Sequence, residues 1–312
     1  MLSRTASCLY WLGRYVERMS YVARLLEVAQ RMSAMTSSSA MTEWRSALIA
    51  SGGEPEFLER HTTIDAAAII DFLGRNKSYS SSIIASMEAA RHNARTVRGA
   101  ITVDMWDAIN GTWLEARSLS DRDFSRGYLS QTLDWFKMRA ILFNGAHSNT
   151  MLRSDAFYFV SLGTYIERVD NTSRILDVKY NVLLPSYEQV GGGLDYGQWT
   201  AILRAVSAQR AYHFLYKDRV KPWNVAELML LRRETPRSLR ACYDEITSNL
   251  DLLNDHYQSR GGECHRLAGE LHARLRYGRI EDIFQGGLHE FLTEYIDRTI
   301  DLGGEIENFY FN

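Results

Sequence analysis

Apolar residues recur at intervals of three and four along most of the chain, which is the spacing of one face of an α-helix. Three of these stripes are clear. They consist of Leu12, Val16, Met19, Ala23 and Leu26; of Ile83, Met87, Ala90, Ala94, Val97 and Ile101; and of Leu288, Phe291, Leu292, Tyr295, Ile296 and Ile300. No stretch alternates between apolar and polar residues as a half-buried β-strand would. The pattern therefore predicts an all-α fold, a compact helical bundle.

Proline and glycine mark the interruptions between the predicted helices, and the chain contains only 4 prolines. Thr235-Pro236 is the strongest predicted helix start, because threonine caps helices and proline favours the first helical position. That helix is predicted over 237–256. Loops are predicted at 33–42, 51–55, 185–197 and 260–262. The third contains three consecutive glycines, so it is a candidate lid, with a plain connector as the alternative.

The N-terminal helix recurs 150 residues later in the chain. The segment Leu12-Gly13-Arg14-Tyr15-Val16-Glu17-Arg18 aligns with Leu162-Gly163-Thr164-Tyr165-Ile166-Glu167-Arg168. A weaker repeat, at an offset of 156, aligns Ser82-Ile83 with Ser238-Leu239. We therefore predict two duplicated, pseudo-symmetric halves, residues 1–150 and 151–312, that bury their apolar stripes against each other as one continuous unit.

The composition limits the classes of function. The chain has 36 Lys and Arg against 38 Asp and Glu, a formal charge of -2, so it lacks the overall positive field of a nucleic-acid-binding protein. The longest uncharged apolar run, 156–166, is shorter than the roughly 20 residues that span a bilayer. The three cysteines, Cys8, Cys242 and Cys264, form no CxxC pair, which fits a reducing compartment. We expect a cytoplasmic protein without nucleic-acid or membrane partners.

One narrow arc of the duplicated helix has the same residues in both copies. These are Gly13, Glu17 and Arg24 in the first copy, and Gly163, Glu167 and Arg174 in the second. Exposed polar positions are energetically almost interchangeable, so a repeated arc of this kind is expected to contact something. Glycine permits the close approach of a neighbour, and a glutamate–arginine pair carries charge that survives partial burial.

Two interpretations of this arc stay open. In the first, its residues form a structural ion-pair network where the halves meet. In the second, Glu17 and Glu167 line a shared cleft as candidate catalytic groups, where their proximity could raise one pKa into the general-acid range. Arginines in that cleft could hold a carboxylate or phosphate in bidentate fashion. The candidate ligand-binding residues are Arg18, Arg24, Arg168 and Arg174.

Three more arginines, Arg91, Arg95 and Arg98, flank the apolar face of the helix predicted around residues 83–101. An anion could dock on Arg91 and Arg95. The alternative is a solvated helix edge with an ion pair between Glu88 and Arg91.

Metal and nucleotide sites are not indicated. Di-iron helical bundles use Glu-x-x-His ligands, which this chain lacks; the nearest spacing, Glu88 with His92, has no second copy. The phosphate-binding loop, the dinucleotide fingerprint and the nucleophile elbow are all missing. Most of the tryptophans fall within apolar phases, so core packing is expected rather than a stacking surface. We expect no metal and no cofactor.

Several separate motifs resemble the alpha-E superfamily of bacterial proteins in their order and spacing. They are Met1-Leu2-Ser3-Arg4, Leu9 to Arg18, Ala23 to Leu26, Ala90 to Arg98, Leu162 to Lys179 and Pro236-Arg237-Ser238. The resemblance spans nearly the whole chain. Ser7, Cys8 and Thr164 depart from the family's pattern, which weakens Arg14 and Thr164 as site residues.

The resemblance also implies partners. Members of the superfamily look like companions of a circularly permuted ATP-grasp ligase and a transglutaminase-like peptidase, a system that makes and trims amide or peptide bonds. Our first hypothesis is a non-catalytic helical partner or substrate-binding subunit that uses its Glu/Arg faces for recognition. The alternative is an enzyme that acts on an amine- or carboxylate-bearing peptide-like substrate, with Glu17 and Glu167 as acid and base.

Overall fold

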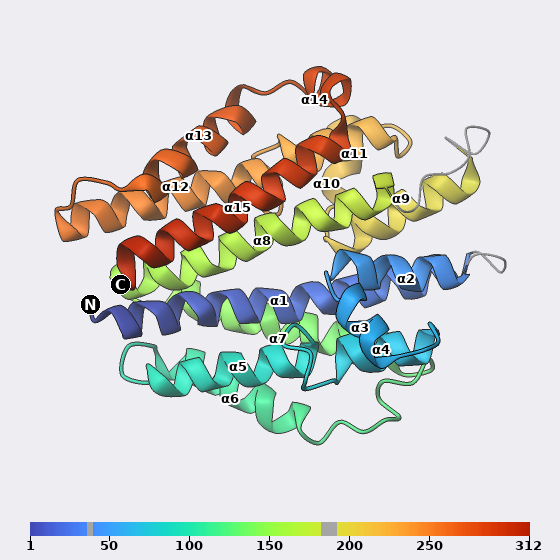
Figure 1. The fold of residues 1–312 in the computed structure, drawn as a ribbon, viewed down its shortest axis with the longest axis horizontal. Coiled ribbons are helices and arrows are strands. Elements are labelled where there is room, and N and C mark those ends of the chain that lie inside the picture. Colours follow the sequence, from blue (N-terminus) through green and yellow to red (C-terminus); the bar gives the residue numbers. More distant parts are fainter. Residues whose placement is uncertain (36–39, 182–191) are drawn as a thin grey trace.

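The computed structural model describes residues 1–35, 40–181 and 192–312, which fold into fifteen α-helices without a β-strand in those ranges (Figure 1). The all-α prediction is confirmed. The helices are α1 (Ser3–Ser33), α2 (Ala40–Ala50), α3 (Glu54–Arg60), α4 (Ala66–Gly74), α5 (Ile83–Thr96), α6 (Val103–Ala116), α7 (Leu129–Thr150), α8 (Asp155–Asn181), α9 (Gly193–Ala205), α10 (Gln209–Tyr216), α11 (Pro222–Leu230), α12 (Leu239–Tyr257), α13 (Glu263–Tyr277), α14 (Ile280–Gly286) and α15 (Leu288–Tyr310).

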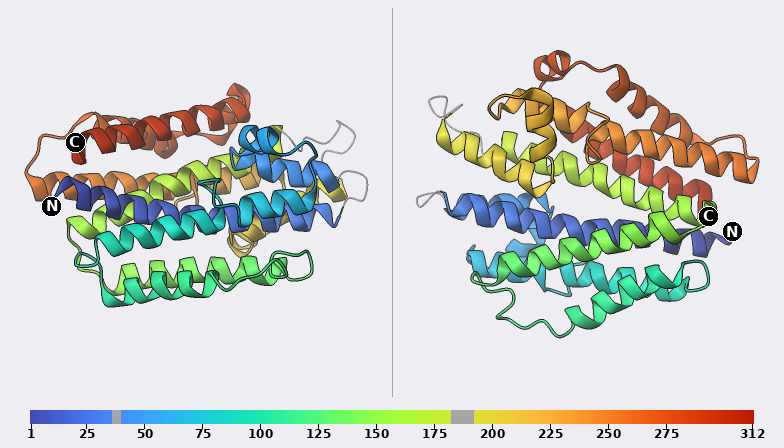
Figure 2. Two further views of the ribbon diagram at one scale, coloured as in Figure 1. Left: turned by 60° about the horizontal axis from the view of Figure 1, so that its bottom comes forward. Right: turned by 180° about the vertical axis from the view of Figure 1, so that it is seen from behind.

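The two long helices α1 and α8 lie at the centre of the molecule and run in the same direction (Figures 1 and 2). Their mutual contact is the most extensive between any two helices. Helices α5 and α7 pack on α1, whereas α12 and α15 pack on α8. Helix α6 lies against α5 and α7, and α13 lies against α12 and α15. The core is therefore organised along the α1–α8 pair.

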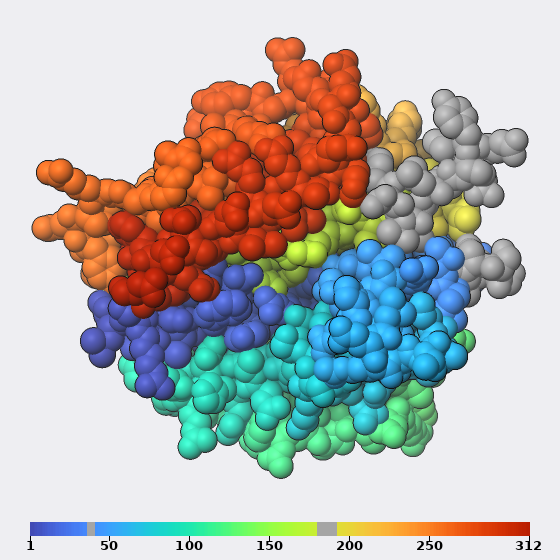
Figure 3. Space-filling view, viewed as in Figure 1, coloured from blue at the N-terminus to red at the C-terminus, as the bar shows by residue number. Residues whose placement is uncertain are grey.

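The surface of the central pair is only partly covered. In the space-filling view, α1 stays visible between α15 and α5 near the N-terminus, and α2 to α4 cover the other end (Figure 3). The five residues of the first apolar stripe, on α1, are all buried, as predicted. For the third stripe, the prediction of a buried face is wrong at Ile300. Its exposed fraction is 55%, because this residue turns away from the core side of α15.

Serine hydroxyls determine where two of the flanking helices begin. Ser82 caps α5 by accepting the N–H of Ala85 at 3.1 Å, and Ser238 caps α12 by accepting the N–H of Ala241 at 3.0 Å. The helix start predicted at Thr235-Pro236 is therefore wrong: α12 begins at Leu239. The sequence contains two capping residues close together, and the second one makes the hydrogen bond.

Helix boundaries repeat between the halves of the chain. Helices α4 and α11 each have 9 residues, and their first residues, Ala66 and Pro222, are 156 positions apart. The capping residues Ser82 and Ser238 have the same separation. These matches support the duplication, which itself stays a prediction, as does the division at residue 150.

The predicted loops agree only in part with the structure. Residues 51–53 and 260–262 connect helices. Residues 40–42 belong to α2, Glu54 and Pro55 begin α3, and Gly193–Gly197 form the first turns of α9, so the loop prediction is wrong for these three segments. The rest of the candidate lid, residues 185–191, lies outside the described residues, and so do residues 36–39 of the first loop.

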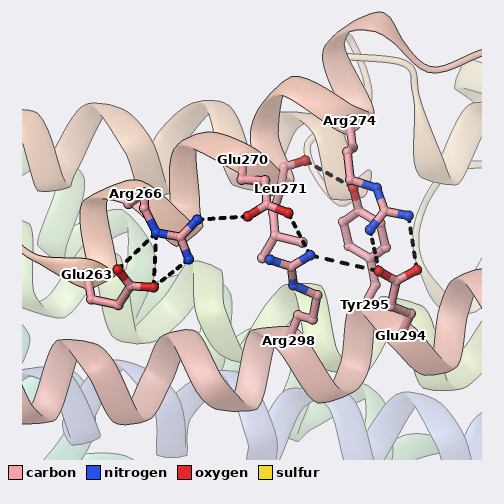
Figure 4. Close-up of polar contacts among 8 residues, drawn as sticks. All are labelled: Glu263, Arg266, Glu270, Leu271, Arg274, Glu294, Tyr295 and Arg298. Atoms are coloured by element: carbon pink, nitrogen blue, oxygen red, sulfur yellow. Dashed lines mark hydrogen bonds and ion pairs between the residues drawn. The ribbon is translucent and has the colours of Figure 1, made fainter.

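A chain of ion pairs links α13 and α15 on the surface (Figure 4). Each charged group meets one of opposite sign on the same or the facing helix, with Arg298 Nη1 2.7 Å from Glu270 Oε1 and Arg274 Nη1 2.5 Å from Glu294 Oε1. The members are Glu263, Arg266, Glu270, Arg298, Glu294 and Arg274. Since these side chains are solvent-accessible, each pair contributes little to the free energy of folding.

Candidate functional site

The two repeated glycines lie where α1 and α8 touch backbone to backbone. A Cβ atom on Gly13 would be 2.2 Å from the carbonyl oxygen of Val160, and one on Gly163 would be 1.9 Å from the carbonyl oxygen of Tyr10. No other residue type permits this approach without moving a helix. The contact brings the following helical turns, with Glu17 and Glu167, between the two helices.

Glu167 accepts hydrogen bonds from two arginines of α1. Arg18 binds it in bidentate fashion, with Nε 2.6 Å from Oε1 and Nη2 3.0 Å from Oε2. Arg14 Nε donates to Oε2 at 2.8 Å. Every polar atom of this carboxylate is therefore engaged by a charged donor, which is the stronger kind of hydrogen bond.

Glu17 has the reciprocal arrangement. Arg168 of α8 donates from Nη2 to Oε2 at 2.9 Å, and Arg237 donates from Nη1 to Oε1 at 2.6 Å. Arg237 lies just before α12, in a segment predicted to be helical. Each of the two central helices thus contains a glutamate that is bound by at least one arginine of the other helix.

Both carboxylates are buried and ionised. The exposed fraction of the side chain is 0% for Glu17 and 3% for Glu167. Burial alone would raise their pKa values, but the adjacent guanidiniums outweigh it: Arg168 and Arg237 lower the pKa of Glu17 well below its usual value, and Arg18 and Arg14 lower that of Glu167 to about 2. The pKa shift is opposite in direction to the one that a general acid needs.

Arg24 and Arg174 occupy equivalent positions in the two helices but have different hydrogen-bond partners. Arg174 Nε donates to Asp170 Oδ2 at 2.8 Å. Arg24 is buried and meets no carboxylate among the described residues; it donates to the carbonyl oxygen of Ala205 and, at 3.4 Å, to Ser207 Oγ. Burial lowers the pKa of Arg24 to about 9. The expected pairing of Arg24 with a glutamate is wrong, because the carboxylate of Glu17 is already bound by two other arginines.

Positive charge is in excess around these contacts. We call this set of residues the crossing cluster. It contains six arginines and three carboxylates: Arg14, Arg18, Arg24, Arg168, Arg174 and Arg237, with Glu17, Glu167 and Asp170. In addition, Nε of Arg168 and Oδ1 of Asp170 are both buried without a hydrogen-bond partner among the described residues. The arginines of the cluster therefore outnumber its carboxylates by two to one, and its positive charge is not balanced from within.

A family model described as Alpha-E, a predicted α-helical domain with a conserved ER motif, matches residues 1–311. The chain belongs to the Alpha-E family. Neither the curated proteins nor the solved structures include a match to it. In this Alpha-E chain, the Glu-Arg pairs Glu17-Arg18 and Glu167-Arg168 both lie in the crossing cluster, whereas Glu59-Arg60 is exposed at the end of α3.

The arginines of α5 lie apart from the crossing cluster in this Alpha-E fold. Arg91 Nε donates to Asn110 Oδ1 at 3.1 Å, and its guanidinium lies 3.9 Å from the ring centroid of Trp113 on α6. Arg95 is exposed. The Glu88–Arg91 pair of the alternative interpretation is not formed; Lys77 Nζ is the cation near Glu88, at 3.9 Å. Arg98 likewise lies over an aromatic ring, that of Trp106.

Sequence reasoning misses two members of the crossing cluster. The repeat weakens Arg14 as a site residue because its counterpart is Thr164, yet Arg14 binds Glu167. Arg237 appears only inside the motif Pro236-Arg237-Ser238. That motif is the one signal for it, but the motif does not say which distant carboxylate the arginine reaches.

Membrane-spanning helices and metal clusters are both missing from the described part of the Alpha-E chain. None of its helices is long and apolar enough to cross a membrane. Among the same residues, no group of three or more His, Cys, Asp or Glu side chains could hold a metal ion.

Proposed function

We propose that this Alpha-E chain is a non-catalytic helical subunit of an ATP-grasp amide- or peptide-ligase system, and that the arginines of its crossing cluster bind an anionic group of the substrate or of the ligase. The excess of six guanidiniums over three carboxylates carries the proposal. An anion that enters the cluster would balance the positive charge that its three carboxylates leave uncompensated.

The exposures of the side chains favour binding by the arginines rather than by the glutamates. The four arginines that hold the carboxylates keep exposed fractions of 11% to 18%, and the carboxylates themselves keep 0% to 3%. Nη2 of Arg14 and Nη1 of Arg18 have no acceptor among the described residues. Guanidinium groups held in this way from one side suit a planar carboxylate or a phosphate.

The family resemblance supplies the proposed partners. A circularly permuted ATP-grasp ligase would perform the ATP-dependent step, and a transglutaminase-like peptidase would cleave the product. This division fits a chain without a phosphate-binding loop. We place the system in the cytoplasm, in keeping with the scattered cysteines of this chain.

The alternative, an enzyme with Glu17 and Glu167 as acid and base, has less support. Acid–base catalysis near neutral pH requires a carboxyl group that can hold a proton there and can reach the substrate. The lowered pKa values and the burial of both carboxylates oppose each requirement.

Copurification with the ligase tests the proposal. The tagged chain is co-expressed with a circularly permuted ATP-grasp ligase and a transglutaminase-like peptidase, the partners that the family resemblance implies, and complexes are detected by size exclusion with light scattering. The same purified chain is then titrated with tetraglutamate by calorimetry. We expect Arg18→Gln to weaken at least one of these interactions by about tenfold, as the loss of a charged hydrogen bond does.

Arg210→Gln is the matched control, because Arg210 is exposed on α10. It removes the same charge outside the crossing cluster and should leave both interactions unchanged. The proposal fails if the wild-type chain binds neither the ligase nor tetraglutamate. It also fails if Arg210→Gln weakens binding as much as Arg18→Gln does.

A further inference from the structure

A second feature that faces solvent lies between α5, α6 and the segment that follows α6. It is a cavity of about 260 Å³, which is close to the liquid volume of eight or nine water molecules. Its apolar wall includes Ile84, Met87, Ala116, Leu119 and Phe124. An apolar wall of this kind, with a few polar groups at the edge, is typical of small-molecule sites.

Trp113 forms one side of the cavity and is in contact with two guanidiniums. The Cζ atom of Arg91 is 3.9 Å from its ring centroid, and that of Arg117 is 4.6 Å away. Neither arginine pairs with a carboxylate among the described residues; Arg91 donates instead to the amide oxygen of Asn110. A cationic ligand that stacked on this ring would therefore meet two like charges.

Further cationic side chains lie at the edge of the cavity, and some of them are already paired with a carboxylate of the chain. Arg75 is already neutralised, with Nη1 2.5 Å from Asp121 Oδ1. Lys77 Nζ lies 3.9 Å from Glu88, beyond hydrogen-bond distance. Arg117 makes no side-chain hydrogen bond or ion pair within the described ranges. Glu88 also lines the cavity and lies within ion-pair range of Lys77, so a ligand carboxylate would engage Arg117 first and share Lys77 with Glu88.

We propose that this cavity binds a small amphipathic carboxylate. The apolar group of the ligand lies against Met87 and Phe124, and its carboxylate accepts hydrogen bonds from Arg117 and Lys77. The size of the cavity limits the apolar group to about one aromatic ring. This site does not involve the crossing cluster, so it is independent of the proposed function.

Titration of the full chain with phenylacetate tests the proposal, by calorimetry and by the fluorescence change of tryptophan. We expect saturable binding with a Kd of about 1 mM or tighter. The neutral analogue 2-phenylethanol and the cation phenethylamine should bind about tenfold more weakly, because they lack the charged hydrogen bonds. If all three probes bind alike, or if phenylacetate shows no saturation at about ten times that Kd, the proposal is overturned.

Three variants assign the binding to this cavity. Arg117→Gln should weaken phenylacetate binding by about tenfold. Ala116→Leu retains every charge but fills the cavity, and it should abolish binding. Arg210→Gln, an exposed arginine on α10, is the control and should bind as the wild type does. Equal loss in Arg117→Gln and Arg210→Gln, with melting temperatures unchanged, would show that charge alone attracts the probe and would overturn the assignment.

Discussion

The backbone of Gly163 on α8 lies against the carbonyl oxygen of Tyr10 on α1, with no room for a side-chain atom between them. Gly13 makes the reciprocal contact with Val160. This pair of contacts brings the two helices close enough for each to bind the other's glutamate. The distance between the helix axes therefore controls the geometry of the whole crossing cluster.

Alanine at either glycine should separate the helices. We expect Gly163→Ala to lower the free energy of unfolding by about 1–3 kcal/mol or more, since the new Cβ would overlap a backbone atom. Urea unfolding measures this change. Gly145→Ala is the control: Gly145 lies within α7 with open space where a Cβ would stand, so that substitution should stabilise the chain by about 0.5–1 kcal/mol. If Gly163→Ala left the free energy of unfolding unchanged, this result would contradict the close contact.

Removal of one buried carboxylate should destabilise the chain strongly. Glu167→Gln leaves the guanidiniums of Arg14 and Arg18 without their anion, and we expect a loss of about 3–5 kcal/mol in the free energy of unfolding. Glu294→Gln, in the exposed ion-pair chain of α13 and α15, should cost about 1 kcal/mol or less. If Glu167→Gln instead retained the wild-type melting temperature but lost ligand binding, the glutamate would have a functional role and not a structural one.

The contribution of Glu167 should depend on pH in a defined direction. Its pKa is lowered from 4.5 to about 2 in the folded chain, so its stabilising effect is complete above the unfolded pKa and is lost as the pH falls through the folded pKa. The melting temperatures of wild type and Glu167→Gln should therefore differ most near about pH 7 and converge towards about pH 2. A difference that stays constant over this range would argue against the ion pairs.

His147 should make the fold acid-sensitive at a higher pH. Its ring is buried against Phe157, at a centroid distance of 4.1 Å, and burial lowers its pKa from 6.5 to about 4. The neutral form is thus favoured in the folded state, so stability should fall as the pH drops from 6.5 to about 4, by about 3 kcal/mol. In His147→Gln the fall that this histidine causes should be missing from the profile. The exposed His92→Gln variant should keep the wild-type profile.

Salt should distinguish the two kinds of ion pair. Arg298 binds Glu270 on the surface, so Arg298→Gln should cost about 1 kcal/mol or less at low salt and almost nothing in about 1 M NaCl. Arg18 binds a buried carboxylate, so the cost of Arg18→Gln should persist at high salt. Urea unfolding at both salt concentrations checks the difference. Equal salt dependence of the two variants would contradict the burial of the crossing cluster.

Much of the architecture follows from local sequence patterns. The apolar spacing predicts an all-α fold, and the first stripe, from Leu12 to Leu26, is buried throughout. The recurrence of Gly13 and Glu17 at Gly163 and Glu167 indicates a face with a partner, and that face contacts the other copy of the helix. A periodic pattern can identify a buried face because burial repeats with the helical turn.

Other features depend on distant parts of the chain and leave no local signal. Arg237 binds Glu17 from 220 positions away, which no helical spacing reveals. One glutamate pKa is expected to rise if the two carboxylates meet, but each carboxylate is surrounded by arginines and its pKa is lowered. Burial of Arg24 without a carboxylate also depends on where the end of α9 lies.

The parallel arrangement of α1 and α8 has a consequence for synthesis of the protein. On the ribosome, α1 emerges well before α8, so the surface around Gly13 acquires its partner only when α8 has also left the exit tunnel. Contacts between segments so far apart in the chain form late and expose apolar surface in the meantime. A nascent chain that stalls before α8 is complete would therefore be a substrate for chaperones.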